Sequence, residues 1–157
     1  MRRATGPWTP AVRALLAYLA SAGFAGAPRL IDSGGERREV LQYVVGETVG
    51  DQVPFPAWCW ADPTLVQVAR LLRRYHVVVS GFRPTEPMAW HSAEAAVGPA
   101  EVVCHNDVSP ATVVRRDGEV AALLDWDMAV PAPPEWDLAH AAWQFVPLHP
   151  PGLAARL

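Results

Sequence analysis

The stretch VVCHNDVSPATVVRRDGEVAALLDWD, residues 102–127, decides the fold of this chain. Two β-type runs, Thr112–Arg115 and Val120–Leu124, flank the dipeptide Asp117-Gly118. This dipeptide favours a two-residue hairpin turn, because both of its residues tolerate a positive φ. The sequence therefore predicts that the chain folds back on itself here as an antiparallel hairpin.

The predicted hairpin brings two distant carboxylates together. Pairing across the turn sets Thr112 opposite roughly Leu123, which carries Asp125 to the loop that holds His105 and Asp107. Close carboxylates serve two chemistries, the binding of a hard cation through oxygen and the activation of a hydroxyl by a general base. Residue types alone leave both chemistries open.

Composition places the chain among globular proteins of one domain. Its 157 residues are enough for a single core, and 51% apolar against 18% charged residues is typical of a folded chain. A formal charge of −3 makes nucleic acid an improbable partner, and no apolar run indicates a signal peptide or a membrane span. Two cysteines do not form a disulfide framework, so we expect a cytoplasmic protein with free thiols.

Three helices and two further strands are predicted from periodicity and capping. The helices are 9–22, with Thr9 as N-cap and Gly23 after its end, 64–78 and 135–145; the strands are 29–31 and 39–45. Residues 50–63 and 81–99 have the composition of loops. Each predicted helix has a stripe of side chains at helical spacing. The stripes are, in order, Val12, Leu15, Leu16 and Leu19; Leu65, Val68, Leu72 and Tyr75; and Trp136, Ala139, His140 and Trp143.

The motif His105-Asn106-Asp107, followed by Pro110 and then by Asp125-Trp126-Asp127, resembles the catalytic core of a known family. This is the aminoglycoside phosphotransferase and choline kinase-like family, whose members are relatives of the protein kinases. The resemblance implies phosphoryl transfer from ATP (or GTP) to a small-molecule hydroxyl, with Mg²⁺. It also implies that Asp107 orients or deprotonates the hydroxyl and that Asp125 binds the metal.

Other site residues follow from the same resemblance. The metal site extends to Asp127 and to Thr112, which stands where the family has asparagine, and Asp127 as a turn cap is the alternative. His105 and Asp137 are expected to stabilise the catalytic loop, and Asp137 also suits the first turn of its helix. The backbone of Tyr43, Val44 and Val45 is expected to bind the adenine edge as a hinge, with an ordinary strand as the equal alternative.

The implied fold is α+β and protein-kinase-like. Residues 1–47 would form a partial small lobe ending in the hinge-like strand, and residues 48–157 the catalytic half of the large lobe. Relative to the family, the chain is short at both ends, so we expect exposed apolar surface and self-association. The acceptor that would be phosphorylated is left undetermined.

Arginine is the only basic residue type, with 13 copies and no lysine. The strand lysine that holds phosphates in kinases is therefore missing, and residues 9–22 contain no acidic partner for it. Ser33-Gly34-Gly35 is typical of a hairpin turn rather than of a phosphate loop. Two other functions remain open: a catalytically degenerate, nucleotide-binding relative, and a metal-dependent phosphohydrolase that uses His105, Asp107, Asp125 and Asp127.

Overall fold

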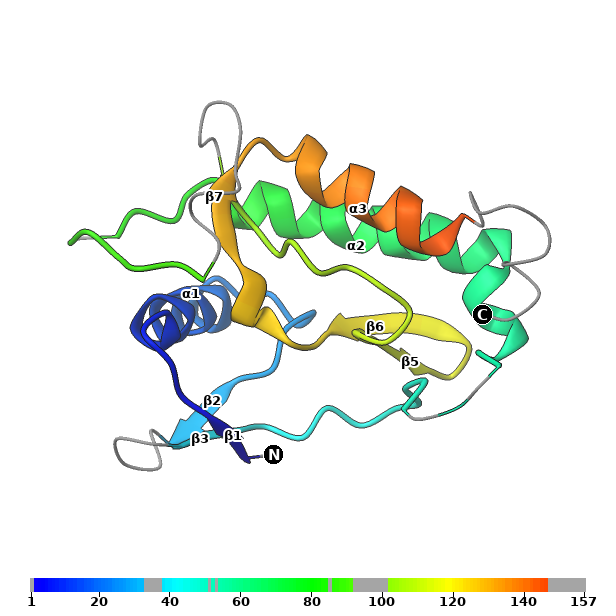
Figure 1. The fold of residues 1–157 in the computed structure, drawn as a ribbon, viewed down its shortest axis with the longest axis horizontal. Helices are drawn as coiled ribbons and strands as arrows, with labels where there is room; N and C mark the ends of the chain where they lie inside the picture. The colour runs from blue at the N-terminus through cyan, green and yellow to red at the C-terminus, as the bar shows by residue number, and fades with distance from the viewer. Residues whose placement is uncertain are drawn as a thin grey trace.

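The computed structural model describes residues 2–32, 38–50, 52, 54–84, 86–91 and 102–146. In these residues, three helices are combined with short strands that pair antiparallel, which is an α+β fold (Figure 1). The elements in order are β1 (Arg2–Ala4), α1 (Thr9–Ser21), β2 (Leu30–Asp32), β3 (Arg38–Leu41), the 3₁₀ turn η1 (Ala57–Trp60), α2 (Asp62–Val79), β4 (Val102–Cys104), β5 (Val113–Arg116), β6 (Glu119–Leu123), the 3₁₀ turn η3 (Trp126–Met128), β7 (Val130–Ala132) and α3 (Glu135–Phe145).

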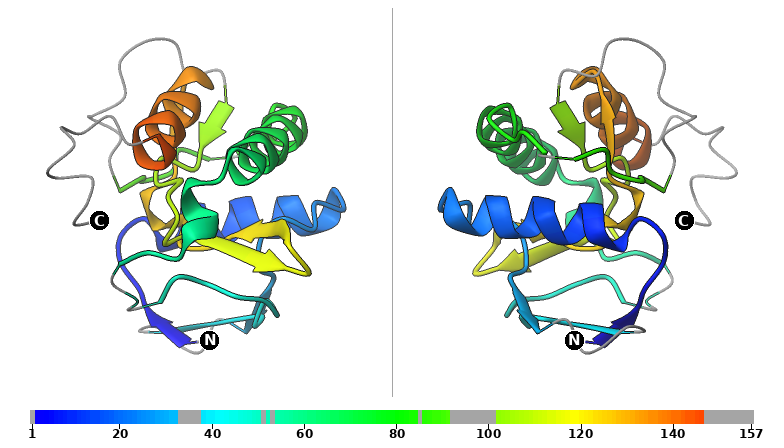
Figure 2. Two further views of the ribbon diagram at one scale, coloured as in Figure 1. Left: turned by 90° about the vertical axis from the view of Figure 1, so that its right-hand side faces the viewer. Right: turned by 90° about the vertical axis from the view of Figure 1, so that its left-hand side faces the viewer.

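The N-terminal strands form a small antiparallel sheet in the order β1-β3-β2. Figures 1 and 2 show α1 between this sheet and the pair formed by α2 and α3. The expected strand at 29–31 is thus present, one residue later, and β1 was not predicted because it has only three residues. The predicted turn at Ser33-Gly34-Gly35 lies outside the described residues.

The central hairpin consists of β5 and β6, and its turn has the predicted geometry. Asp117 and Gly118 have φ values of 52° and 83°, as a two-residue turn with two left-handed positions requires. The predicted register was wrong by one residue, because Val113 rather than Thr112 pairs with Leu123. Thr112 instead accepts a 2.7 Å bond from the N–H of Leu124, so the hairpin still ends beside Asp125.

A second antiparallel pair, β4 with β7, was not predicted. Val103 pairs with Pro131 at its centre, although proline cannot donate a hydrogen bond to a strand ladder. Proline is compatible with this position because, among the described residues, β7 pairs with β4 alone, and an edge strand needs no N–H on its outer side. The pair fixes both ends of the segment between the two strands, since β4 leads into residues 105–112, the loop that carries Asp107, and β7 follows η3.

The predicted strand 39–45 ends early, at Leu41. Beyond it the chain runs to an isolated bridge in which Glu47 exchanges two backbone hydrogen bonds, 2.6 and 2.8 Å long, with Arg115 of β5. Gly46 makes this approach feasible, because a Cβ there would lie 2.6 Å from the carbonyl oxygen of Arg115. The segment therefore joins the small sheet to the central hairpin.

The helices have nearly the predicted bounds, and α3 has the same bounds as predicted. The apolar stripe predicted for α3 was wrong, because Trp136 and Trp143 are 36% and 52% exposed. The buried positions of this helix are Asp137, Ala141 and Phe145, so one carboxylate lies on its inner face. Thr9 is the first residue of α1 rather than its cap, and its Oγ1 accepts a hydrogen bond from the N–H of Gly6.

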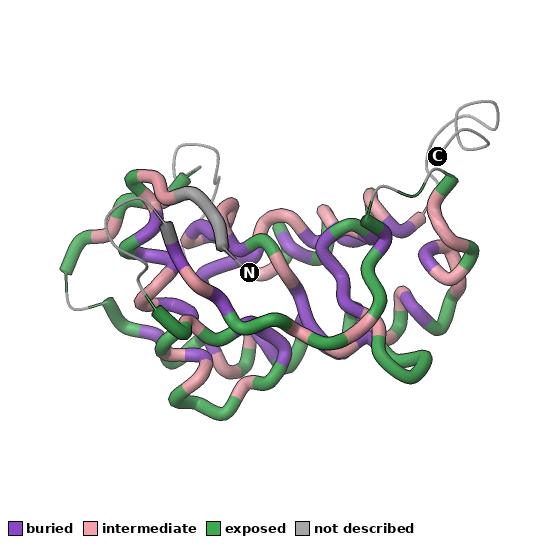
Figure 3. The backbone as a smooth tube through the Cα atoms, turned by 90° about the horizontal axis from the view of Figure 1, so that it is seen from below, coloured by how far each residue is buried: buried purple, intermediate pink, exposed green. Residues whose placement is uncertain are grey.

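One hydrophobic cluster includes residues of α1 and β3 in the N-terminal part of the chain and of α2, β5, β6 and α3 in the rest. Trp126 is its largest fully buried side chain and lies between the helices and the catalytic segment. Figure 3 shows the buried positions inside the molecule and exposed positions along its outer loops. None of the helices in the described part of the chain is long and apolar enough to cross a membrane.

Candidate active site

A cavity of about 600 Å³ is lined by four of the nine site residues predicted from the sequence, Asp107, Thr112, Asp125 and Asp127. Asp107 enters it from the loop after β4, and Asp125 and Asp127 enter from the segment after β6. Its other lining residues are Pro28, Leu41, Ser109, Ala111, Thr112 and Leu124. The small sheet, the catalytic loop and the hairpin thus all contribute to one cavity.

Asp107 is half-buried in this cavity. Burial raises the pKa of its carboxyl group, the neighbouring His105 and His140 oppose that shift, and the negative charge of Asp125 adds to it. Both carboxylates line the same cavity, so each lies in the other's electrostatic field. A raised pKa makes Asp107 a better proton acceptor than an ordinary surface aspartate.

His105 is fully buried and bonded through both ring nitrogens. Its Nε2 lies 2.9 Å from the carbonyl oxygen of Leu124 and therefore donates, while Nδ1 accepts a 3.3 Å bond from the N–H of Asp107. The ring also contacts Trp126 edge-on, with centroids 4.5 Å apart. Burial lowers the pKa of His105, so the neutral ring joins the catalytic loop to the end of β6.

The lowered pKa predicts acid sensitivity. Below about pH 6.5 the unfolded chain protonates His105 and the folded chain does not, so the free energy of unfolding should fall by up to about 1.4 kcal/mol per pH unit. This loss should continue until the pH reaches the lower, folded-state pKa. Urea titrations between pH 7 and 5, with His105→Gln beside the parent, measure it. The other four histidines are present in both proteins, so equal slopes would contradict the prediction.

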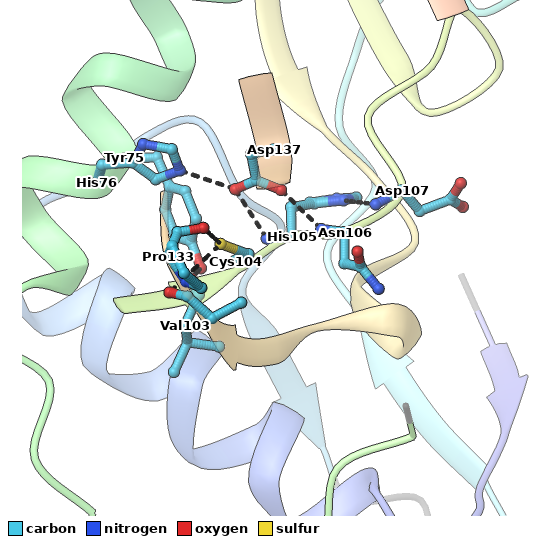
Figure 4. Close-up of polar contacts among 10 residues, drawn as sticks. Tyr75, His76, Val103, Cys104, His105, Asn106, Asp107, Pro133 and Asp137 are labelled. Atoms are coloured by element: carbon cyan, nitrogen blue, oxygen red, sulfur yellow. Dashed lines mark hydrogen bonds and ion pairs between the residues drawn. The ribbon is translucent and has the colours of Figure 1, made fainter. Parts of the chain in front are cut away.

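The Asp137 carboxylate lies directly behind the catalytic loop (Figure 4). Its Oδ2 accepts a 3.0 Å bond from the N–H of His105, and its Oδ1 accepts a 2.7 Å bond from the N–H of Asn106. The residue is fully buried. These two bonds are the loop contacts that the family resemblance implies for Asp137.

Thr112 lines the cavity but uses its hydroxyl within the loop. The Oγ1 donates to the carbonyl oxygen of Asp107 at 2.8 Å and accepts a 3.0 Å bond from the N–H of Ser109. A hydroxyl has one proton and two acceptor positions, so a single lone pair is left for any metal ion. Thr112 thus stabilises the backbone on either side of Asp107, and metal binding by it stays a prediction.

Asp125 takes a backbone conformation that few residues tolerate. Its φ and ψ are 58° and 67°, in the left-handed region, where aspartate and asparagine are favoured over other side chains with a Cβ. The buried Trp126 follows it, and its Nε1 donates to the carbonyl oxygen of Leu123 at 2.9 Å. This anchor leaves Asp125 exposed and Asp127 half-buried at the cavity.

The hinge-like residues lie apart from the carboxylates. Tyr43, Val44 and Val45 do not line the cavity, and the side chains of Tyr43 and Val45 are 71% and 62% exposed. Leu41 and Pro28 reach the cavity from that side of the molecule instead. Nucleotide binding by residues 43–45 therefore stays a prediction.

An ion pair joins α1 to the small sheet. Arg13 Nε donates to Oε1 of Glu39 at 2.7 Å, and Glu39 is fully buried. The cation comes from the helix and the carboxylate from the strand, the reverse of the strand lysine and helix glutamate of protein kinases, which this chain lacks.

Two histidines that contact Asp137 or the loop after Asp107 were not among the site residues predicted from the sequence. His76 of α2 binds Asp137, and His140 of α3 has its Nδ1 3.3 Å from the carbonyl oxygen of Val108. His76, Cys104 and Asp137 are also the one group, in the part of the chain that the structure describes, with atoms spaced to hold a metal ion. Both cysteines are buried thiols; burial raises the pKa of Cys104 and raises that of Cys59 to about 11.

Comparison with known proteins is consistent with this geometry. A trifolitoxin immunity protein from Rhizobium leguminosarum bv. trifolii is 33% identical over 159 residues, which cover 99% of this chain and 59% of that protein. The crystal structure of a macrolide 2′-phosphotransferase from Brachybacterium faecium, an apoenzyme, has a similar fold. Its TM-score is 0.57 at 16% identity, over 98% of this chain and 65% of that chain.

The chain thus spans about three fifths of the length of these relatives. Its fold is that of the kinase-like phosphotransferases over this length. Residues 7–157 match the phosphotransferase enzyme family. Since this match covers nearly the whole sequence, the chain belongs to the phosphotransferase enzyme family.

Proposed function

We propose that this chain contains the catalytic core of a phosphotransferase that moves the terminal phosphoryl group of ATP (or GTP) to a hydroxyl of a small molecule. One observation carries the proposal: Asp107, Asp125 and Asp127 enter a single cavity that is also lined by Leu41 of β3 and by Pro28, which precedes β2. In a phosphoryl transfer, most of the rate comes from positioning and from neutralising charge. The cavity offers oxygen groups suited to both tasks.

Asp107 is the group that would orient the acceptor hydroxyl and accept its proton. Its half-buried position and raised pKa favour this use, and the bonds of His105 and Thr112 fix its backbone. Asp125 and Asp127 would hold Mg²⁺, because carboxylate oxygens are the ligands this ion prefers. When bound, the ion supplies positive charge to the phosphates. Asp125 is exposed at the cavity, so its oxygens are accessible to an ion and a nucleotide.

The proposal is tested by titrating the chain calorimetrically with ATP in the presence and absence of Mg²⁺, and then with adenosine. Mg²⁺-dependent ATP binding together with adenosine binding supports a phosphotransferase site. Binding of phosphate with Mg²⁺ but not of adenosine would instead favour a metal-dependent phosphohydrolase. No binding of any of these compounds would refute the proposal for this chain.

Thr112 should limit metal binding. An asparagine at this position could donate its NH₂ group to the carbonyl oxygen of Asp107, as the hydroxyl does now, and still offer an amide oxygen to Mg²⁺. We therefore expect the parent to bind Mg-ATP weakly and to turn over slowly or not at all, and Thr112→Asn to bind it more tightly. Calorimetry and an ATP turnover assay measure both.

Asp125→Asn is the control for the Thr112 experiment, since asparagine tolerates the left-handed backbone of this position and should lose the added affinity in the Thr112→Asn background. The argument from the missing amide oxygen would be wrong if the parent already turned over at about 1 per second, a rate typical of kinases, and the asparagine added nothing. In that case the Thr112 hydroxyl serves only to hold the loop backbone at Asp107 and Ser109.

A further inference from the structure

A second cavity, of about 510 Å³, lies beside the end of α1 and shares no described lining residue with the candidate active site. Its walls are the turn at residues 22–26 and side chains of the last turns of α2 and of β6, namely Arg73, Arg74, Val77, Val78 and Ala121. We call it the α1–α2 cavity. A concave, mostly apolar space of this size with a few polar groups is typical of small-molecule sites.

The walls of the α1–α2 cavity are fixed by packing and hydrogen bonds. The ring of Phe24 lies 5.8 Å from that of Tyr75 in α2. Gly26 approaches α2 so closely that a Cβ there would lie 2.6 Å from Cδ1 of Leu71. The carbonyl oxygen of Gly26 also accepts a 2.9 Å bond from the N–H of Leu123 in β6. The cavity is therefore formed before a ligand binds, which lowers the entropic cost of binding.

Ala121 reaches the lining through an irregularity in the hairpin. Val114 pairs with Ala122 and Arg115 with Val120, so Ala121 is an extra residue in β6. Such bulges turn a side chain out of the regular alternation and are frequent beside functional sites. Because the side chain at this point is small, the β6 wall of the cavity leaves space for a ligand.

Two arginines bring positive charge to the cavity. Arg73 and Arg74 are exposed, and within the described part of the chain neither guanidinium group makes an ion pair or a hydrogen bond. No acidic residue lies within four positions of either arginine, and Arg70 adds a like charge at helical spacing, which repels them. An anion in the cavity would relieve this repulsion, and a carboxylate fits the planar guanidinium fork.

We propose that the α1–α2 cavity binds a small organic carboxylate with an apolar body. The carboxylate would contact Arg73 and Arg74, and the apolar body would contact residues 22–26, Val77 and Ala121. Burial of the apolar body would supply affinity that two exposed guanidinium groups do not provide by themselves. Both parts of the ligand are therefore required for binding.

The α1–α2 cavity and the candidate active site are built on the same two segments of chain. Residues 22–26 line the first cavity and Pro28 lines the second, while Ala121 lines the first and Asp125 the second. We therefore expect the ligand to act as an effector that changes the affinity of the chain for Mg-ATP. Mg-ATP should then change the affinity for the ligand by the same factor. This effector role rests on the proposed function, but binding of the carboxylate does not.

Octanoate is the probe for this site, because it joins a carboxylate to an apolar chain. Octanol has the same chain without the charge, and acetate has the charge without the chain. Titration of the isotope-labelled protein, followed by NMR, should show saturable shifts of the backbone amides of residues 22–26 and of Leu123 with octanoate. Octanol and acetate should each bind at least about tenfold more weakly, the effect of losing one charge-assisted hydrogen bond or two buried methylene groups.

The arginines are tested by substitution at the surface of α2. Arg73→Gln combined with Arg74→Gln should weaken octanoate binding at least about tenfold and octanol binding less than about twofold. Arg70→Gln is the matched control, because Arg70 is exposed on the same helix but does not line the cavity. It should leave the octanoate affinity within about threefold of the parent. Val77→Glu, which adds a negative charge to the lining, should also weaken octanoate binding more than octanol binding.

Three results would overturn the proposed site. Equal binding of octanoate and octanol would show that the charge has no role. A loss of octanoate affinity in Arg70→Gln as large as in the double variant would make the arginines an ordinary solvated face. Shifts confined to the exposed side chains of α3, which are Trp136, Leu138 and Trp143, would place the probe elsewhere.

The effector role has a separate test. Calorimetric titration with Mg-ATP, in the presence and absence of saturating octanoate, should show a change in affinity of about fivefold or more, the lower end of coupling between two sites. An unchanged affinity would refute the effector role. A chain that binds no Mg-ATP would count against the proposed function and the effector role together, whereas the octanoate titration of the free chain would still decide the binding site.

Discussion

Replacing Asp137 with alanine should lower the free energy of unfolding by about 3–5 kcal/mol, the cost of removing one partner from a buried charged network. The substitution leaves the N–H groups of His105 and Asn106 and the ring N–H of His76 without their acceptor in the interior. Buried donors without partners are costly because they give up their bonds to water. Urea unfolding followed by circular dichroism measures the change.

The control for Asp137 is Glu135→Ala. Glu135 lies in the same first turn of α3 and is exposed, so it shares the favourable position near the helix N-terminus but none of the loop contacts. Its removal should cost about 0.3–1 kcal/mol. Similar losses in the two variants would mean that Asp137 acts only on the helix dipole and that its bonds to the loop add little.

The sequence predicted the bounds of α3 but not its inner face. Trp136 and Trp143 have helical spacing and large apolar surfaces, which indicate a core stripe when hydrophobicity is the only guide. The helix instead turns Asp137 inward, where its carboxylate accepts hydrogen bonds from three N–H groups that are buried or partly buried. Periodicity cannot reveal such a need, since the donors come from segments 31 to 61 residues away.

The hairpin was predictable because its signal is local. Asp117-Gly118 determines the turn, and the turn brings Asp125 to the catalytic loop. The register was wrong by one residue because Thr112 uses its side chain to bind the Asp107 carbonyl and starts no strand. The β4–β7 pair has three residues in each strand and a proline in one, too little for a pattern to indicate.

The candidate site was predictable where a motif supplied it. Asp107, Asp125 and Asp127 were placed by the family motif, and all three line one cavity. His76 could not be found in this way, because it lies 61 residues from Asp137 and its spacing in α2 is that of an ordinary surface position. Residues that support a loop from another element leave no local signal in a single sequence.

Asp125→Asn should remove the Mg²⁺-dependent part of ATP binding, with a loss in affinity of at least about tenfold, the lower end of the range seen when metal sites lose a supporting group. The amide keeps the size of the side chain but loses the negative charge and one oxygen. Asparagine is the right substitution because it tolerates the left-handed backbone of this residue, with φ at 58°, whereas alanine would add strain. Calorimetric titration with ATP, with and without Mg²⁺, gives the result.

Asp117→Asn is the matched control, because it makes the same chemical change at an exposed site in the hairpin turn. The turn should remain intact, since asparagine before Gly118 is a favoured sequence for two left-handed residues. If both variants lost the same Mg²⁺-dependent affinity for ATP, the loss would reflect the net charge of the chain rather than a bond to the ion. If Asp125→Asn kept the full Mg²⁺ effect on ATP binding, the ion would have to be held by Asp127 and Asp107. Asp107 could not then also serve as the base that accepts the hydroxyl proton.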